Sequence, residues 1–179
     1  MTDRTRRPWC WGATSTDIAG AWPCDGLLAV PHVSLYRAVN VGAPPAVVYR
    51  WVCQLKVAPY SYDWLDNFGR RSPRELTPGA GELAVGQRMM VFKITAFEHD
   101  RHITGVGLPS AARIFGAMAV SYTVRAAGQR SSRLAVRLDA GGNAPLGRLR
   151  RGLLAWGDLV MMRKQLLTLK ELAERHASG

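Results

Sequence analysis

The stretch GAMAVSYTVRAAGQRSSRLAVRLDA, residues 116–140, carries the strongest fold signal in the chain together with the leucine-rich run that follows it at 144–179. Apolar and polar residues alternate along both arms of 116–140, which is the period of a half-buried strand. Each arm therefore has one apolar face and one polar face, as in an antiparallel sheet that buries one side. We predict a β-hairpin here, with Met118 and Tyr122 on the apolar face.

The run over 144–179 repeats apolar residues at three- and four-residue spacing, which predicts one long amphipathic helix. One stripe of this helix consists of Leu149, Leu153, Trp156, Val160 and Leu167, and a second group, Leu159, Met162, Leu166 and Leu169, widens it. About 30 helical residues span roughly 45 Å, which is longer than one sheet is usually wide. The helix is therefore expected to lie along a curved sheet, with Trp156 facing that sheet.

The same periodicities assign the rest of the chain. In chain order they predict a short helix within 11–26 that begins with a capping box of Thr14 and Asp17, a strand over 32–45, a helix over 44–55, a short helix over 61–68, a loop over 71–87, a strand–turn–strand unit over 88–108 and a connection over 109–115. This order predicts an α+β fold: a curved antiparallel sheet wrapped around a long C-terminal helix, with two short helices closing one end. Such a sheet does not easily fill its own centre, so a cavity is expected.

Composition indicates one domain. The chain has 179 residues, 47% of them hydrophobic, and we expect a single domain over 11–176 after a flexible basic arm at 1–10. Three widely spaced cysteines, Cys10, Cys24 and Cys53, favour neither a disulfide framework nor a zinc site. His99 and His102 flank a predicted turn and are expected to point apart, so no metal and no cofactor is predicted. No signal peptide is visible, and a cytoplasmic location is expected.

The net charge of +11 raises the question of anionic partners. The arginines are dispersed along the chain, and the run GRLRRG, residues 147–152, is their one true cluster. We therefore expect no specific nucleic-acid partner, whereas a transient contact with a membrane surface remains open. The expected partner is an apolar small molecule, and the protein is expected to be a monomer or a homodimer.

Four short motifs carry a resemblance to a known superfamily. They are WGAT at 11–14, VNVGAPPAVVYRW at 39–51, YSYDW at 60–64 and VGQ at 85–87. With them the chain resembles the SRPBCC or START-like helix-grip superfamily, which holds START lipid-transfer domains, the birch-pollen allergen family and polyketide cyclase/dehydrase proteins. It is most similar to a bacterial polyketide cyclase-like branch. The branch often has Gly-Trp before YSY, whereas this chain has Ala58 and Pro59, a change that would reshape the mouth of the pocket.

The resemblance implies a helix-grip fold and places the aromatic segment PYSYDWLDNFGR, residues 59–70, at the cavity entrance. Aromatic side chains supply stiff apolar walls, and tyrosine hydroxyls add polar points that orient a ligand. The predicted ligand-binding residues are Arg37, Tyr60, Tyr62, Asp63, Trp64, Met90, Phe92, Met118, Tyr122, Trp156 and Val160. The alternative for the aromatic and methionine side chains is ordinary core.

Arg37 is the one charged candidate on a predicted buried face, where a guanidinium needs a partner. That partner would be Asp63, Glu98 or an acidic group of a ligand, and the alternative is a purely structural ion pair or a side chain that reaches solvent. No catalytic residue is predicted, although Tyr62 and Asp63 could perform acid–base chemistry.

Three functions follow from this reading. The leading one is the binding or carriage of a hydrophobic small molecule, namely a lipid, a polyketide-like compound or an isoprenoid, in the internal cavity. The first alternative is a cyclase- or dehydratase-type enzyme that acts in the same cavity. The second is an interaction protein with a filled cavity and a basic surface that docks on membrane or nucleic acid.

Overall fold

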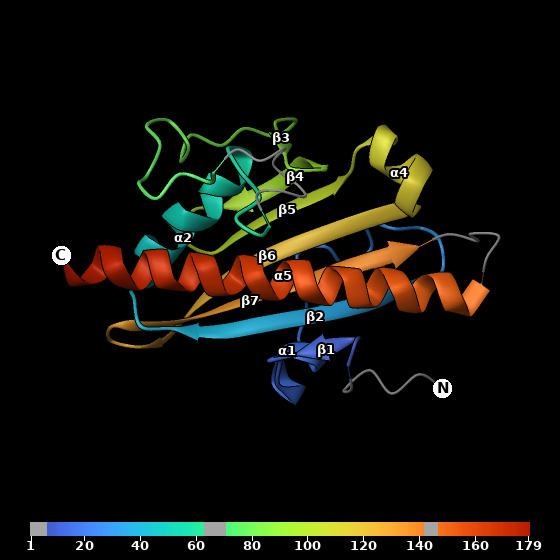
Figure 1. Ribbon diagram of the computed structural model, residues 1–179, viewed down its shortest axis with the longest axis horizontal. Helices are drawn as coiled ribbons and strands as arrows, with labels where there is room; N and C mark the ends of the chain where they lie inside the picture. The colour runs from blue at the N-terminus through green and yellow to red at the C-terminus, as the bar shows by residue number, and fades with distance from the viewer. Residues whose placement is uncertain (1–6, 63–70, 142–146) are drawn as a thin grey trace.

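The computed structural model describes residues 7–62, 71–141 and 147–179 (Figure 1). Its strands are β1 (Cys10–Trp11), β2 (His32–Val41), β3 (Arg88–Met89), β4 (Phe92–Glu98), β5 (His102–Gly107), β6 (Ala117–Gly128) and β7 (Ser131–Gly141). They form one seven-stranded sheet in the order β1-β2-β7-β6-β5-β4-β3. The strand β1 runs parallel to β2, and the other neighbouring pairs are antiparallel. The predicted hairpin over 116–140 is thus β6 and β7.

The helices are α1 (Ser15–Ala19), α2 (Pro45–Cys53), the 3-10 turn η1 (Gln54–Lys56), α4 (Pro109–Phe115) and α5 (Gly147–Ser178). Figure 1 shows α5 running lengthwise across the sheet, with α2 beside its C-terminal half. A curved sheet that holds one long C-terminal helix is the helix-grip fold, as predicted. The short helix predicted over 61–68 falls mainly on residues 63–70, which lie outside the described residues.

The helix α4 corrects the prediction of a plain connection over 109–115. Pro109 occupies the first turn, where its missing N–H removes no hydrogen bond. Gly116 ends the helix with φ of 87°, a conformation that favours glycine. Seven residues span only two turns, so the segment is too short to show a helical period in the sequence.

The face that α5 buries is not the stripe that contains Trp156. Trp156 is 51% exposed and Leu153 is 67% exposed, and Val160 is also exposed. The buried face of α5 consists of Ala155, Leu159, Gln165, Leu166, Leu169, Leu172 and Ala173. The two apolar stripes are one residue apart, which is about 100° around a helix. Periodicity alone does not decide between such stripes, so the predicted orientation of Trp156 toward the sheet is wrong.

The outer face of the sheet was predicted to be wet, but the N-terminal segment covers part of it. Tyr36, Ala119 and Ala135 are buried there in a second cluster with Trp22 and Cys24. The backbone carbonyl of Trp9 accepts a hydrogen bond from the N–H of Tyr36, at 2.8 Å, next to the strand β1. The last residues of the predicted arm, Trp9 and Cys10, therefore belong to the sheet edge, whereas residues 1–6 lie outside the described residues.

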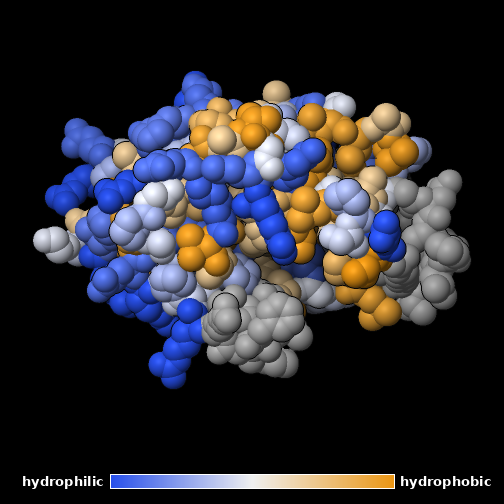
Figure 2. All heavy atoms as spheres, turned by 90° about the horizontal axis from the view of Figure 1, so that it is seen from above, coloured by the Kyte–Doolittle hydropathy of each residue, from blue (hydrophilic) through white to orange (hydrophobic). Residues whose placement is uncertain are grey.

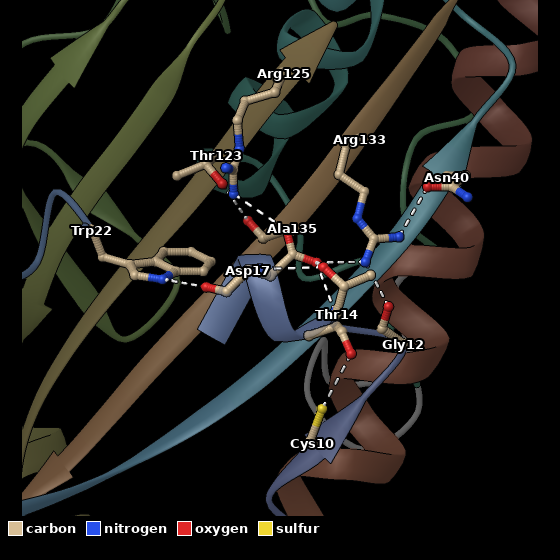
Figure 3. A network of polar contacts seen from close by, with 11 residues as sticks. Cys10, Gly12, Thr14, Asp17, Trp22, Asn40, Thr123, Arg125, Arg133 and Ala135 are labelled. Atoms are coloured by element: carbon tan, nitrogen blue, oxygen red, sulfur yellow. Dashed lines mark hydrogen bonds and ion pairs between the residues drawn. The ribbon is translucent and has the colours of Figure 1, made fainter. Parts of the chain in front are cut away.

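A polar network around Asp17 fixes this segment to the sheet (Figure 3). The predicted capping box is present, because Thr14 and Asp17 exchange bonds between side chain and backbone N–H at 2.9 and 3.2 Å. Asp17 also accepts from Arg133 of β7 at 2.6 Å and from Arg125 of β6 at 3.3 Å. The carboxylate of Asp17 thereby joins α1 to two strands.

The WGAT motif has a structural explanation at this contact. Gly12 has φ of 71°, and a Cβ at this position would meet the carbonyl oxygen of Ala38 at 2.1 Å. Any side chain would therefore push β1 away from β2. Trp11 lies under the guanidinium of Arg163 of α5, 5.6 Å from its ring centroid, so the motif also contacts the long helix.

Candidate functional site

A cavity of about 860 Å³ lies between α5 and the inner face of the sheet. The sheet contributes Leu35, Phe92, Met118, Val120, Tyr122 and Leu138, and α5 contributes Ala155, Asp158, Met161, Met162 and Gln165. Met118 and Tyr122 lie on the face where alternation placed them. The wall is therefore mainly apolar, and its polar groups include Tyr122 and the polar side chains of α5.

The rim of the cavity is apolar and partly basic. Val57, Val91, Phe115, Leu153 and Leu154 line the cavity and are also exposed to solvent. Figure 2 shows hydrophobic side chains gathered toward the end of the molecule where α4 and the first turns of α5 lie in Figure 1. Lys56 and Arg88 add cationic groups to the lining. Exposed apolar residues around an apolar hollow are typical of a ligand entrance.

Arg37 of β2 is the most deeply buried charge near this cavity. It is 1% exposed, and its guanidinium donates to the Asp158 carboxylate at 2.7 Å. It also donates to the carbonyl oxygens of Trp9 and Tyr36, both at 2.9 Å, and to that of Ala155 at 3.5 Å. The prediction that Arg37 lies on the buried face is thus confirmed.

The partner of Arg37 is Asp158. Glu98, one predicted partner, instead pairs with Arg101 at an exposed turn, and Asp63 lies outside the described residues. Burial raises the pKa of the Asp158 carboxyl to about 6, although the Arg37 guanidinium opposes the shift. Burial likewise lowers the pKa of Arg37, and Asp158 opposes that shift. The pair therefore places a carboxyl group that titrates near neutral pH in the cavity wall.

A second polar group in the wall is Tyr122 of β6. Its hydroxyl donates to Oε1 of Gln165 at 2.8 Å, and Nε2 of Gln165 donates to the carbonyl oxygen of Pro59 at 2.6 Å. Nε2 also lies 3.3 Å from Sδ of Met90. Burial raises the pKa of Tyr122 far above its usual value, so this hydroxyl stays protonated. Through these bonds Tyr122, Gln165 and Pro59 connect the sheet, α5 and the segment that follows η1.

Four predicted ligand-binding residues line the cavity: Met90, Phe92, Met118 and Tyr122. Arg37 lies behind the wall and reaches the cavity through Asp158. Tyr60 does not line the cavity, because its ring packs edge-on against Trp51, with centroids 6.2 Å apart. Its hydroxyl donates to Oε1 of Gln54 at 3.4 Å. The core alternative therefore describes Tyr60.

Tyr62 and Val160 line a different space. They border a second hollow of about 340 Å³ together with Arg7, Trp11, Leu159 and Arg163. Trp156 is not among the residues that line the main cavity, because it projects from another side of α5. Asp63 and Trp64 lie outside the described residues. Whether any of these side chains contacts a ligand stays a prediction.

Sequence reasoning missed Asp158 and Gln165. These two polar residues lie seven positions apart on α5, each directly before a buried leucine. Two full helical turns separate them, so they project on the same side of the helix, into the same cavity. A polar pair with this spacing beside an apolar stripe is a signal that could have identified both.

Metal ligands do not gather in the described part of the chain. Within residues 7–62, 71–141 and 147–179, no group of three or more His, Cys, Asp or Glu side chains could hold a metal ion. The ring of His99 packs at a tilt against Tyr49, with ring centroids 5.3 Å apart, whereas the ring of His102 lies beside Thr104. Cys10, Cys24 and Cys53 are free thiols in the core. Among the described helices, none combines the length and the apolar character that crossing a membrane requires.

No protein-family model matches this chain, and no curated protein matches its sequence. Norcoclaurine synthase from Thalictrum flavum, solved in complex with dopamine and hydroxybenzaldehyde, has a TM-score of 0.56 at 12% identity, over 89% of this chain and 96% of that one. Protein MLL2253 from Mesorhizobium loti has a TM-score of 0.50 at 16% identity, over 79% of this chain and 97% of that one. These likenesses confirm the Bet v1-like helix-grip fold and nothing narrower.

Proposed function

We propose that this protein binds and carries an apolar small molecule in the cavity between α5 and the sheet. The observation that supports the proposal best is the cavity itself. Protein interiors are normally packed like organic crystals, yet about 860 Å³ between α5 and the sheet stays unfilled and opens to solvent. Ligand pockets typically measure about 300–1,000 Å³ and are lined mainly by apolar side chains. Lipids, polyketide-like compounds and isoprenoids all suit such a space.

The lining supports reversible binding more than it supports a filled interior. Met90, Met118, Met161 and Met162 contribute flexible thioether side chains, which adapt to ligands of different shape. The exposed apolar rim provides an entrance from solvent. Of the predicted ligand contacts, we retain Met90, Phe92, Met118 and Tyr122 as the residues that touch the ligand.

The proposal is tested with a substitution that fills the cavity. Val120 is buried on β6 and lines the cavity, so Val120→Phe extends a ring into the empty space. Val85→Phe places the same change on an exposed loop and serves as the control. A fluorescent apolar probe should bind the wild type and Val85→Phe and lose affinity for Val120→Phe. Mass spectrometry of a solvent extract of the purified protein identifies any ligand that travels with it.

Two results would reject the binding proposal. One is a probe that binds Val120→Phe as tightly as the wild type. The other is an unchanged melting temperature of the wild type with every apolar compound tested, because a ligand at about a hundredfold excess over its Kd adds about 2.7 kcal/mol of stability. Either result would favour the interaction protein with a surface role.

A cyclase- or dehydratase-type enzyme is the second candidate, and Asp158 is the observation that favours it. A carboxyl group with a pKa near 6 in an apolar cavity suits general acid–base catalysis close to neutral pH. If the cavity catalyses such a reaction, incubation with a poly-β-ketone should yield a cyclised product, and Asp158→Asn should abolish turnover while the probe still binds. Binding of the ketone without turnover would leave carriage as the function.

A further inference from the structure

We propose that the ligand carries a hydroxyl group that donates a hydrogen bond to the Asp158 carboxylate inside the cavity. The proposal rests on the proposed binding function and adds a chemical class to it: an apolar alcohol or phenol. It follows from which hydrogen-bonding groups around the cavity are already engaged and which remain open toward the ligand.

The donors of Arg37 are not available to a ligand. Its two terminal nitrogens donate to Asp158 and to three backbone carbonyl oxygens, those of Trp9, Tyr36 and Ala155. Its Nε has no partner among the described residues, but this atom is buried and Arg37 does not line the cavity. The Arg37 guanidinium therefore bonds only within the protein, and a ligand in the cavity would contact Asp158 instead.

Asp158 presents an open acceptor to the cavity. Its side chain is 14% exposed, and it belongs to the lining of the cavity. Oδ2 accepts the bond from Arg37, whereas Oδ1 accepts no hydrogen bond from any residue that the structure describes. An ionised carboxylate has only acceptor sites, so the group that satisfies Oδ1 must be a donor.

Tyr122 adds a second acceptor in the same cavity. Its proton is directed at Oε1 of Gln165, and the amide nitrogen of Gln165 is directed at the carbonyl oxygen of Pro59. The lone pairs of the Tyr122 oxygen thus remain for a ligand donor. The cationic donors of the lining, Lys56 and Arg88, belong to the rim, where Lys56 already donates to the carbonyl oxygen of Glu82.

Charge excludes the ionised alternatives to the hydroxyl. Arg37 and Asp158 together are neutral, so a ligand ammonium would bring an uncompensated charge into an apolar cavity. A ligand carboxylate has no donor and would lie against the Asp158 carboxylate, which repels it. A hydroxyl supplies the missing donor and adds no charge.

The test compares four ligands that share one ring system: 2-naphthol, 2-methylnaphthalene, 2-naphthoate and 2-naphthylmethylammonium. Each is titrated into the wild-type protein at neutral pH by calorimetry or fluorescence. We expect 2-naphthol to bind about tenfold more tightly than 2-methylnaphthalene, because a hydrogen bond to a charged group is worth at least that factor. The two charged compounds should bind more weakly than 2-methylnaphthalene.

A double variant assigns the preference to the pair. Arg37→Met with Asp158→Leu removes both charges together, which leaves no unpaired charge in the core. The control is Lys170→Met with Glu174→Leu, which removes a pair 3.0 Å apart on the same helix at positions that do not line the cavity. The first double variant should bind 2-methylnaphthalene and lose the preference for 2-naphthol, whereas the control should keep that preference.

The outcomes separate the two proposals. If none of the four compounds binds, the proposed function fails. If the compounds bind but 2-naphthol has no advantage, or 2-naphthoate or the ammonium binds most tightly, the hydroxyl proposal fails and carriage stands. The same holds if the Arg37 and Asp158 double variant keeps the preference. Should that variant fail to fold, the wild-type series decides alone.

Discussion

The guanidinium of Arg37 on β2 and the carboxylate of Asp158 on α5 lie 2.7 Å apart, across the boundary between the sheet and the long helix. A buried ion pair is weak evidence for stability, because the loss of hydration of both charges can exceed their attraction. A pair of well-packed apolar residues would have joined helix and sheet at lower cost. Under the proposed function, the pair holds a charged acceptor in the cavity wall, where a hydrogen-bond donor of the ligand would meet it.

The energetics of this pair give the first prediction. Asp158→Ala leaves the guanidinium of Arg37 buried without its charge partner and should lower the free energy of unfolding by about 3–5 kcal/mol. The double variant with Arg37→Met and Asp158→Leu should stay within about 1 kcal/mol of the wild type. Urea unfolding of the wild type, Arg37→Met, Asp158→Leu and the double variant measures the coupling, and Asp158→Ala is unfolded beside them. A double variant as unstable as Asp158→Ala would contradict the argument.

The second prediction concerns pH and the preference for a hydroxyl ligand. Burial raises the pKa of Asp158 to about 6, so the carboxyl loses its acceptor-only character as the pH falls through this value. The advantage of 2-naphthol over 2-methylnaphthalene should be full at about pH 8 and largely lost at about pH 5. Arg37 and Tyr122 face Asp158 and hold their protons over this range, as does the Cys10 thiol, whose pKa burial raises.

The raised pKa of Asp158 also makes the stability of the fold depend on pH. The folded-state pKa of Asp158 lies above its ordinary value of 3.8, so the folded protein binds the proton more tightly than the unfolded chain does. The contribution of this group is therefore fully present below about pH 4 and is lost as the pH rises through about 6. The double variant should lack both effects, and a pH-independent ligand preference in the wild type would contradict the assignment.

The third prediction concerns Tyr122. Tyr122→Phe removes the donor to Oε1 of Gln165 and leaves that buried acceptor without the bond, which should lower the free energy of unfolding by about 1–3 kcal/mol. Tyr36→Phe is the control, because Tyr36 is equally buried in the outer cluster and its hydroxyl has no hydrogen bond to the residues that the structure describes. Equal losses in the two variants would show that the Tyr122–Gln165 bond carries no particular weight.

Much of the fold could be predicted because its two largest features are local patterns. The alternation over 116–140 and the helical spacing after 144 each state which backbone conformation the residues favour. The predicted orientation of Trp156 was wrong because α5 has two neighbouring apolar stripes, and both fit a helix equally well. The covered outer face was missed because alternation reports the polarity of a face, and the small side chains of Ala119 and Ala135 lie under a segment that is distant in sequence.

The site was predictable only in part for a related reason. Strand parity placed Arg37 on the inner face, and parity also placed Met118 and Tyr122 there. The partner of Arg37 is 121 positions away, and the pairing depends on how α5 is rotated and shifted along the sheet. Neither the rotation nor the shift is encoded in a repeat of the sequence. The spacing of Asp158 and Gln165 could have indicated a polar site on α5, but the pairing of Asp158 with Arg37 became visible only in the folded protein.

The fourth prediction concerns the N-terminal segment that Asp17 holds on the sheet. Asp17→Ala leaves Arg125 and Arg133 without their carboxylate and removes the helix cap, so the free energy of unfolding should fall by about 3 kcal/mol or more. Hydrogen exchange should become faster in residues 9–28. Glu171→Ala is the control, because the exposed Glu171 pairs with Arg175 at 2.6 Å on α5, outside this segment, and its loss should cost about 1 kcal/mol or less.

Acid should weaken the contact of Asp17 with Arg125 and Arg133. Burial raises the pKa of Asp17, but the bonds from Arg133 and Thr14 outweigh it, and the net pKa is lowered. The stabilisation from Asp17 is therefore present above the ordinary carboxyl pKa and is lost as the pH falls through the lowered value. Hydrogen exchange in residues 9–28 that does not respond to Asp17→Ala would show that the apolar contacts of Trp22 hold the segment by themselves.

The last prediction distinguishes the two apolar stripes of α5. Leu159 is buried against the sheet, so Leu159→Ala should lower the free energy of unfolding by about 2–5 kcal/mol through lost burial and the cavity left behind. Trp156 is half exposed, so Trp156→Ala should cost about 1 kcal/mol or less despite the removal of a larger side chain. Urea unfolding of both variants, followed by far-UV circular dichroism, measures the difference. A larger loss in Trp156→Ala would mean that α5 is rotated by about 100°, and a helix rotated in that way would also carry Asp158 away from Arg37.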